Sequence, residues 1–192
     1  MTADDSNPIA RLLHSLDFLD QSETDCIASL FEPVWLKKDE FFIKTGDPVN
    51  KVAFIAKGLL CRYNYHQKGH KIIDQYLIEN QFFTDRKGYF SHGHSVMTIQ
   101  AIIPCQLWTI PVTAIEELSN TSINFIKVIK SITSETLDHG LDLKDMLAIG
   151  DPLQRIHRFY EFHPHYWPNI PKQDLSSYLK MSKSLFYQCQ AK

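Results

Sequence analysis

The chain has 192 residues, of which 44% are hydrophobic and 12% aromatic, which is enough to bury a core as one generous domain or two small ones. This composition excludes an intrinsically disordered protein, and the net charge of −2 excludes a uniformly basic nucleic-acid-binding chain. From residue 150 onward, six Lys or Arg stand against three Asp or Glu, so a weakly basic tail follows an acidic body. A small DNA-binding appendage has this distribution, although on charge alone chance explains it equally well.

The four cysteines are scattered without the spacing of a metal site, which indicates reduced thiols in a cytosol. The N-terminal stretch MTADDSNPIARLLHSL lacks the basic start and apolar run of a signal peptide. No window approaches the ~18 apolar residues of a membrane span. We therefore expect a cytoplasmic protein without a membrane partner.

Residues 8–31 have apolar residues at helical spacing and predict two short helices, with Ser22 as a helix N-cap. Between residues 41 and 110 the pattern changes to short runs rich in Val, Ile, Phe, Tyr and Thr, separated by glycines. Such evenly spaced strands indicate an antiparallel sandwich or barrel. The stretch HQKGHK predicts a hairpin turn in which Gly69 has a positive φ.

Helical spacing returns between residues 112 and 148, and the helix from about 121 to 148 is apolar on more than one side. Such a helix needs two partners, which we expect to be its own β domain and a symmetry mate. Gly140 interrupts the pattern and leaves a kink or break open. The tripeptide GDP at residues 150–152 marks a boundary, because Asp151 suits an N-cap and Pro152 suits the first helical turn.

The last segment, IPKQDLSSYLKMSKSLFYQCQAK, has the spacing of two helices joined by a tight turn. Numbered from Lys172, apolar residues stand at the fourth, eighth, tenth, fifteenth and eighteenth positions, and a small residue stands at the fifth. The turn position, usually glycine, is Lys180, where a left-handed conformation costs roughly 1–2 kcal/mol. Ser182 is placed to cap the second helix. The positions that lock the helices together are Leu175, Ser176, Leu179, Met181, Phe186 and Cys189.

If this segment is a helix-turn-helix, the N-terminal part of its second helix enters a DNA major groove. The candidate base-reading residues are Lys183, Ser184, Tyr187 and Gln188, of which Gln188 suits adenine and Lys183 suits guanine or a phosphate. Candidate phosphate contacts, which position without specifying sequence, are Lys172, Lys180 and Lys192. The alternative is a plain pair of antiparallel helices with a solvated polar face.

A β-roll, one long helix and a terminal helix-turn-helix, in this order, resemble the Crp/Fnr family of dimeric bacterial transcription regulators. The resemblance rests on GDPVNKVAFIAKGLLCRY, with Gly46 and Gly58 at two turns, and on IPKQDLSSYLKMSKSLF. It implies an α+β fold with a jelly-roll-like antiparallel β-roll, flanking helices and a long dimerisation helix. It also implies a sensor domain over 1–148, a helix-turn-helix domain over 149–192, and a homodimer bound to double-stranded DNA.

Cyclic-nucleotide-binding members of that family hold the cyclic phosphate with a short helix after a Gly-Glu pair and with an arginine opposite. In this chain the pair falls on Thr84 and Asp85, and the arginine falls on Ser95. Arg86 lies beside the pair and suits another anion. We therefore expect no cyclic AMP bound in the usual way and no resident cofactor, while an unknown small-molecule effector stays open. One lone cysteine, Cys26, in the first 60 residues excludes an iron–sulfur cluster, whereas haem stays open.

Two other functions compete with DNA reading. A regulator-like protein that has lost DNA binding and acts through protein partners predicts an exposed aromatic patch of Tyr178, Phe186 and Tyr187. DNA reading predicts instead that Phe186 is buried and Gln188 exposed. A metal-binding β-barrel enzyme requires His92-Gly-His94 on a strand, but Gly93 indicates a loop. The sequence favours neither a catalytic site nor a metal site.

Overall fold

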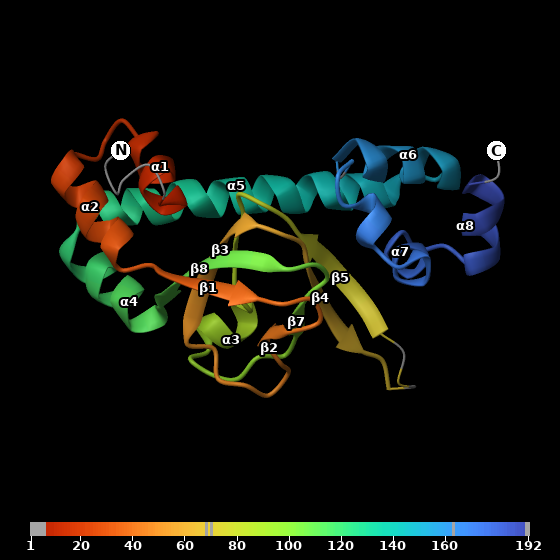
Figure 1. Ribbon diagram of the computed structural model, residues 1–192, viewed down its shortest axis with the longest axis horizontal. Helices are drawn as coiled ribbons and strands as arrows, with labels where there is room; N and C mark the ends of the chain where they lie inside the picture. Colours follow the sequence, from red (N-terminus) through yellow and green to blue (C-terminus); the bar gives the residue numbers. More distant parts are fainter. Residues whose placement is uncertain (1–6, 68, 70, 163, 191–192) are drawn as a thin grey trace.

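The computed structural model describes residues 7–67, 69, 71–162 and 164–190, and it consists of a β-roll, a long helix and a C-terminal group of helices (Figure 1). The roll has two four-stranded antiparallel sheets, which confirms the predicted α+β class with antiparallel sheets. The first sheet has the order β1 (Glu32–Leu36), β8 (Cys105–Pro111), β3 (Lys51–Lys57), β6 (Phe82–Phe83). The second has the order β2 (Phe41–Ile43), β7 (Thr98–Ala101), β4 (Leu60–Tyr65), β5 (Lys71–Leu77).

The turn glycines of the roll adopt the conformations that their positions require. Gly46, Gly58 and Gly69 all have positive φ, and the value of +79° at Gly69 confirms the prediction for that turn. Gly58 is also held in place by packing, because a Cβ built on it would meet the Cα of Cys105 at 2.8 Å. The close approach of β3, β4 and the start of β8 therefore needs glycine at this position.

The N-terminal prediction was right about the two helices and wrong about the cap. The second helix begins after Asp20, whose Oδ1 accepts from the N–H of Glu23 at 2.8 Å, while the Glu23 carboxylate accepts from the N–H of Asp20. This is a reciprocal capping box, and Ser22 lies inside the helix. The strand β1, which the sequence did not predict, is an edge strand paired with β8, where its Pro33 is tolerated.

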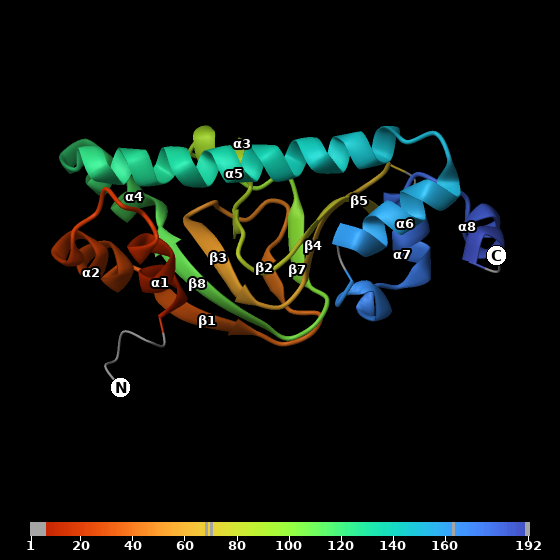
Figure 2. The same cartoon turned by 90° about the horizontal axis from the view of Figure 1, so that it is seen from above.

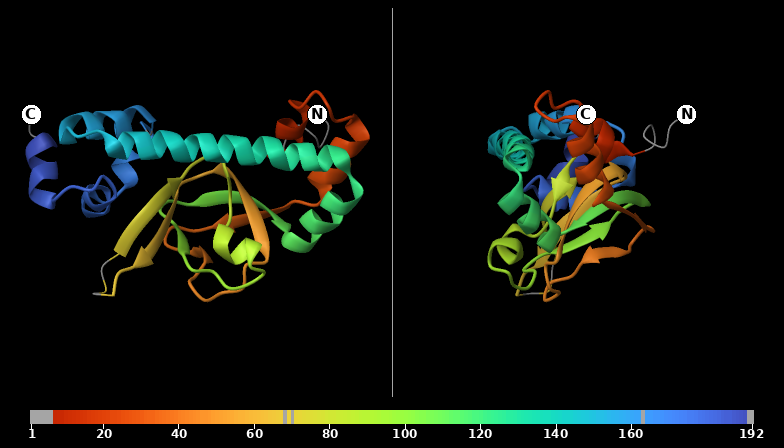
Figure 3. Two further views of the ribbon diagram at one scale, coloured as in Figure 1. Left: turned by 180° about the vertical axis from the view of Figure 1, so that it is seen from behind. Right: turned by 90° about the vertical axis from the view of Figure 1, so that its left-hand side faces the viewer.

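The helix α5 runs along the whole molecule, from the N-terminal helices at one end to the C-terminal ones at the other (Figures 2 and 3). Its N-cap is Ser122, and it continues through Gly140 without a break. No helix in the described part of the chain is long and apolar enough to cross a membrane. The α-helices are α1 (Pro8–His14), α2 (Gln21–Ser29), α3 (Arg86–Phe90), α4 (Val112–Thr121), α5 (Ile123–Ala148), α6 (Pro152–Phe162), α7 (Lys172–Tyr178) and α8 (Lys183–Gln190).

The C-terminal helices pack against the outer side of the β4–β5 ribbon, and the two share one hydrophobic cluster. The ring of Tyr76 on β5 lies 4.9 Å from the ring of Tyr178 on α7 and 6.2 Å from that of Phe159 on α6. At the edge of this contact, Lys71 Nζ lies 3.4 Å from Asp174 Oδ2. A change of chain direction near residue 150 thus separates α5 from α6, while the hydrophobic core continues across it.

Candidate functional site

The turn between α7 and α8, residues 179–182, has the conformation that the sequence predicted. Lys180 has a φ of +53°, so a lysine takes the left-handed position usually held by glycine. The N–H of Leu185 donates to Ser182 Oγ at 3.2 Å, which confirms Ser182 as the cap of α8. The N–H of Met181 donates to the carbonyl of Ser176 at 3.0 Å, closing the chain tightly on itself. These contacts define a tight turn between the two helices.

The predicted locking positions face inward. Leu175, Ser176, Leu179 and Phe186 are buried, and Met181 and Cys189 are partly buried against the same cluster. Ser176 is small enough for α7 and α8 to approach, and its hydroxyl donates to the carbonyl of Gln173 at 2.9 Å.

The outward face of α8 carries the four residues predicted to read bases. Lys183, Ser184, Tyr187 and Gln188 are all exposed, and the exposed fraction of Tyr187 is 52%. Tyr178 and Phe186 are buried, so the three-residue aromatic patch expected of a protein-binding surface does not form.

The three predicted phosphate-contacting lysines lie as follows. Lys172 at the start of α7 lies over this face, with its Nζ 5.6 Å from the centre of the Tyr187 ring. Lys180 is exposed at the turn, while Lys192 lies outside the described residues.

Arg155 on α6 is a structural residue of the C-terminal helices that the sequence pattern does not predict. Its guanidinium donates to the carbonyls of Ile149 and Gly150, at 3.0 and 3.5 Å, where α5 ends. It also donates to the carbonyls of Leu179 and Lys180, at 2.5 and 3.5 Å, in the turn before α8. One side chain thereby ties the end of the long helix to the α7–α8 turn. The acceptors are backbone carbonyls, which every residue has, so no residue pattern predicts this contact.

The four residues predicted for an effector lie together around the start of α3, between β6 and β7. Asp85 is the N-cap of α3 and is 3% exposed, and its Oδ1 accepts from the N–H groups of Lys87 and Gly88 at 2.9 and 3.3 Å. Its Oδ2 accepts from Ser95 Oγ and the N–H of Val96, both at 2.7 Å, and from the N–H of Met97 at 3.1 Å.

These contacts decide the charge of Asp85. Burial raises the pKa of its carboxyl group, but the hydrogen bonds from Ser95 and from the backbone outweigh burial and hold the pKa below its ordinary value. Asp85 is therefore an ionised carboxylate whose two oxygens accept five hydrogen bonds from the chain itself. Thr84 is also engaged, because its hydroxyl donates to the carbonyl of Lys51 at 3.0 Å. Of the four predicted residues, Arg86 alone extends to the surface.

A cavity of about 560 Å³ lies beneath α5, between the β-roll and the N-terminal helices. Most of its lining is apolar, and its three cations are Arg62, which is half-buried, and Arg86 and Lys87, which are exposed and mark its rim. Arg62 is paired with Asp74 on the neighbouring strand β5, with a hydrogen bond from Nε to Oδ2 of 2.6 Å. The apolar lining comes from helices, strands and α5 together, and includes Ile9, Ile27, Phe82, Ile110, Phe125 and Ile132.

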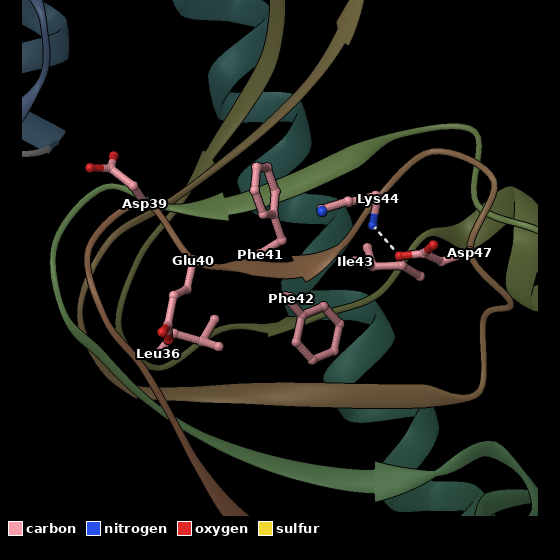
Figure 4. A pocket seen from close by; sticks show the side chains of 8 residues that line it. All are labelled: Leu36, Asp39, Glu40, Phe41, Phe42, Ile43, Lys44 and Asp47. Carbon is pink, nitrogen blue, oxygen red and sulfur yellow. Dashed lines mark hydrogen bonds between the residues drawn. The ribbon is translucent and has the colours of Figure 1, made fainter.

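A second hollow of about 530 Å³ opens to the surface beside β2 (Figure 4). Its acidic groups serve the local turns, since Asp47 Oδ2 accepts from the N–H of Lys44 at 2.8 Å and Glu40 Oε2 from the N–H of Lys37 at 2.7 Å. The Lys44 Nζ covers the ring of Phe41 at 4.5 Å. These contacts engage Glu40, Lys44 and Asp47 within the chain itself.

The remaining chemical candidates are a histidine pair and the thiols. His92 and His94 lie in the connection after α3 rather than on a strand of three or more residues, and His92 Nδ1 faces Glu116 Oε1 at 3.5 Å. The described residues contain no group of three or more His, Cys, Asp or Glu arranged for a metal ion. Burial raises the pKa of Cys61 to about 12 and that of Cys105 to about 11, so both thiols are protonated and unreactive at neutral pH.

Most of the β-roll is similar in sequence to a known domain family, and the chain is similar in fold to several solved structures. Residues 33–122 match the family described as cyclic nucleotide-binding domain. FixK2 from Bradyrhizobium japonicum is 15% identical with a TM-score of 0.67, covering 84% of this chain and 83% of that chain. The c-di-GMP responsive global regulator CLP of Xanthomonas campestris is 14% identical with a TM-score of 0.69, covering 90% of each chain. A protein from Eubacterium rectale, described as a transcriptional regulator of the Crp/Fnr family, is 13% identical with a TM-score of 0.69, covering 90% of this chain and 82% of that chain.

A search of the curated proteins returned no match. At the identities of the solved structures the similarity establishes the fold. Residues 33–122 are thus similar to the cyclic nucleotide-binding domain family, and the chain shares its overall fold with the three solved structures.

Proposed function

We propose that this protein is a dimeric, DNA-binding transcription regulator of the Crp/Fnr type, in which α8 enters the major groove. The observation that carries the proposal is the geometry of α7 and α8. Their packing residues are buried in the hydrophobic cluster that the C-terminal helices share with the β-roll, while Lys183, Ser184, Tyr187 and Gln188 form one exposed face of α8. A reading helix needs this separation of a locked inner face from a polar outer one.

The exposed face suits DNA better than a protein partner. Protein-binding surfaces are enriched in exposed aromatic side chains, whereas on this face Tyr187 is exposed and Tyr178 and Phe186 are buried. The face and its surroundings carry Lys172, Lys180 and Lys183, which suit phosphates. Six such lysines in a dimer predict a modest salt dependence, with a slope of log affinity against log salt of about −5.

The helix α5 supports the dimer. Its outer side exposes Ile123, Ile126 and Leu141, while Phe125 and Val128 on the inner side are buried against the roll. These two faces match the two partners that the sequence pattern called for. The side chain of Leu137, a further member of that pattern, lies outside the described residues.

Ile126→Glu is expected to convert the dimer to a monomer. Ile126 is 46% exposed in one chain, and a second α5 would bury the new carboxylate without a partner. We expect the dissociation constant of the dimer to rise at least about a hundredfold, measured by analytical ultracentrifugation. The matched control is Ile72→Glu, an exposed isoleucine on β5, which is expected to leave the mass unchanged. A wild-type protein that is monomeric at every concentration contradicts the dimer.

Gln188→Ala is expected to weaken binding to the best duplex by at least about thirtyfold and to relax one base position in each half-site. The dimer loses two bidentate base contacts, each worth about 1–3 kcal/mol. Lys183→Ala is expected to weaken all sequences alike and, if Lys183 contacts a phosphate, to reduce the salt slope by about two, because the dimer loses one contact from each protomer. The measurement is selection of duplexes from a random library at low and moderate salt, followed by titration of the enriched site.

The controls for this experiment are Gln21→Ala and Lys38→Ala, which remove the same side-chain types from exposed positions outside the C-terminal helices. The expected site is two-fold symmetric, with half-sites about one helical turn apart. Absence of any enriched sequence, with and without added cell metabolites, would exclude DNA reading and favour the protein-partner alternative.

A further inference from the structure

We propose that the cavity beneath α5 binds an amphipathic monoanion, with a hydrocarbon or aromatic body and one carboxylate, and that this molecule takes the place of a cyclic nucleotide. The proposal deepens the proposed function, because it names the effector class of the regulator on which it rests. It is carried by three features: the lining of the cavity, the cations at its rim, and the occupation of the nearby anion-binding groups by Asp85.

The cavity accepts an apolar body. Its volume of about 560 Å³ lies within the range of small-molecule pockets, about 300–1,000 Å³. Side chains from α1, α2, β3, β6 and α5 contribute aliphatic and aromatic surface, including Ile9, Phe82 and Ile132. No Asp or Glu lines it and most of its lining side chains are apolar, so a hydrocarbon body loses no hydrogen bond on entering.

The rim accepts a negative charge. Arg86 and Lys87, the first two residues of α3, line the cavity, and within the described ranges neither forms an ion pair. Arg62, the third cation of the lining, is already paired with Asp74. Two unpaired cations next to an apolar space match a ligand whose anionic group stays at the mouth while its body is buried. Both cations are exposed, so we expect each to contribute modestly.

A phosphate is disfavoured at the start of α3. The N–H groups of Lys87, Gly88, Val96 and Met97 already donate to the carboxylate of Asp85. A cyclic phosphate would have to displace this buried, ionised side chain or lie against its charge. The chain therefore carries its own anion at the place where the resemblance implies a ligand phosphate, and an incoming anion is left with the rim cations.

The cavity reaches the element that carries the C-terminal helices. Ile129, Ile132, Thr133 and Thr136 of α5 are part of its lining. Arg155 links the end of α5 to the turn before α8. A ligand that binds more tightly when α5 is in one placement than in another therefore shifts the population of orientations of α8.

The first test compares two fluorescent probes that share one aromatic body and differ by one sulfonate: anilinonaphthalene sulfonate and neutral phenylnaphthylamine. The full-length protein is titrated with each at low salt and without DNA. We expect both to bind and the anion to bind about threefold to tenfold more tightly. Arg86→Gln with Lys87→Gln is expected to remove this preference. The matched control, Lys37→Gln with Lys38→Gln, makes the same charge change away from the cavity and is expected to keep it.

Filling the cavity tests its location. Ile132→Trp is expected to weaken both probes at least about tenfold, and Thr136→Trp at the exposed part of the lining provides a second variant if the first does not fold. Decanoate is expected to displace the anionic probe, and cyclic AMP is not. Equal binding of the two probes, or a preference that survives the Arg86 and Lys87 changes, overturns the anion assignment. Displacement by cyclic AMP alone, or full binding by both tryptophan variants, overturns the proposal. Because no DNA is present, failure here is distinct from failure of the DNA selection.

Discussion

Phe159→Ala is expected to lower the free energy of unfolding by about 3–5 kcal/mol, the range for truncating a fully buried phenylalanine. Phe159 is 0% exposed, and its ring lies 6.2 Å from that of Tyr76, 5.8 Å from that of Tyr178 and 6.0 Å from that of Trp167. These rings belong to β5, α7 and the turn after α6, so one side chain joins the β-roll to the C-terminal helices. Its removal leaves a cavity at the point where the two parts share their core.

Urea unfolding at neutral pH measures the loss, and Phe90→Ala is the matched control. Phe90 is 76% exposed on α3, so the same truncation is expected to change stability by less than about 0.5 kcal/mol. We also expect Phe159→Ala to weaken DNA binding, because α7 and α8 lose their support. A loss of less than about 1 kcal/mol for Phe159→Ala would mean that the C-terminal helices do not depend on this contact with the roll.

Local features of the fold were predictable where the signal lies within a few residues. The glycine turns follow from backbone sterics at single positions, and the buried and exposed faces of α7 and α8 follow from helical spacing. Two strands were missed for physical reasons. The edge strand β1 contains Pro33, which weakens a strand signal, and β6 has two residues, Phe82 and Phe83, too few for any period.

Contacts between distant segments were not predictable from one sequence. Lys71 and Asp174 meet across 103 positions of the chain, and nothing in either local pattern pairs them. Arg155 bonds backbone carbonyls, which every residue carries. The cavity is a space between several elements, so it depends on how they pack and not on any single motif.

The residues predicted to bind an effector show most clearly how far the sequence alone can predict the site. The resemblance to cyclic-nucleotide-binding regulators selected Thr84, Asp85 and Ser95 as one group, and the structure brings Asp85 and Ser95 into a hydrogen bond of 2.7 Å. The residue type alone does not show that Asp85 also accepts hydrogen bonds from the free N–H groups at the start of α3 and from those just before β7. An aspartate at that position reads equally well as a ligand-binding residue or as a structural cap.

Asp85→Ala is expected to lower the free energy of unfolding by about 3–5 kcal/mol, because hydrogen bonds to a charged group are strong and the change leaves several donors unpaired in a buried site. The hydroxyl of Ser95 and the N–H groups of Val96 and Met97 lose their acceptor. The N–H groups of Lys87 and Gly88 at the start of α3 lose the same acceptor. Asp17→Ala, at an exposed position near α1, is the matched control and is expected to be close to neutral.

The pH dependence separates the charge of Asp85 from its shape. The pKa of Asp85 is lowered in the folded protein from its ordinary value of 3.8, so its stabilising contribution is complete above that value and is lost as the pH falls through the folded pKa. Asp85→Asn keeps the side-chain size and one acceptor but has no charge to lose. We therefore expect the stability gap between wild type and Asp85→Asn to be constant from about pH 7 to about pH 5 and to narrow below about pH 4. Urea unfolding across this range measures the gap. A gap that does not narrow in acid would mean that Asp85 acts through its shape, and the chain would then not supply its own anion at the start of α3.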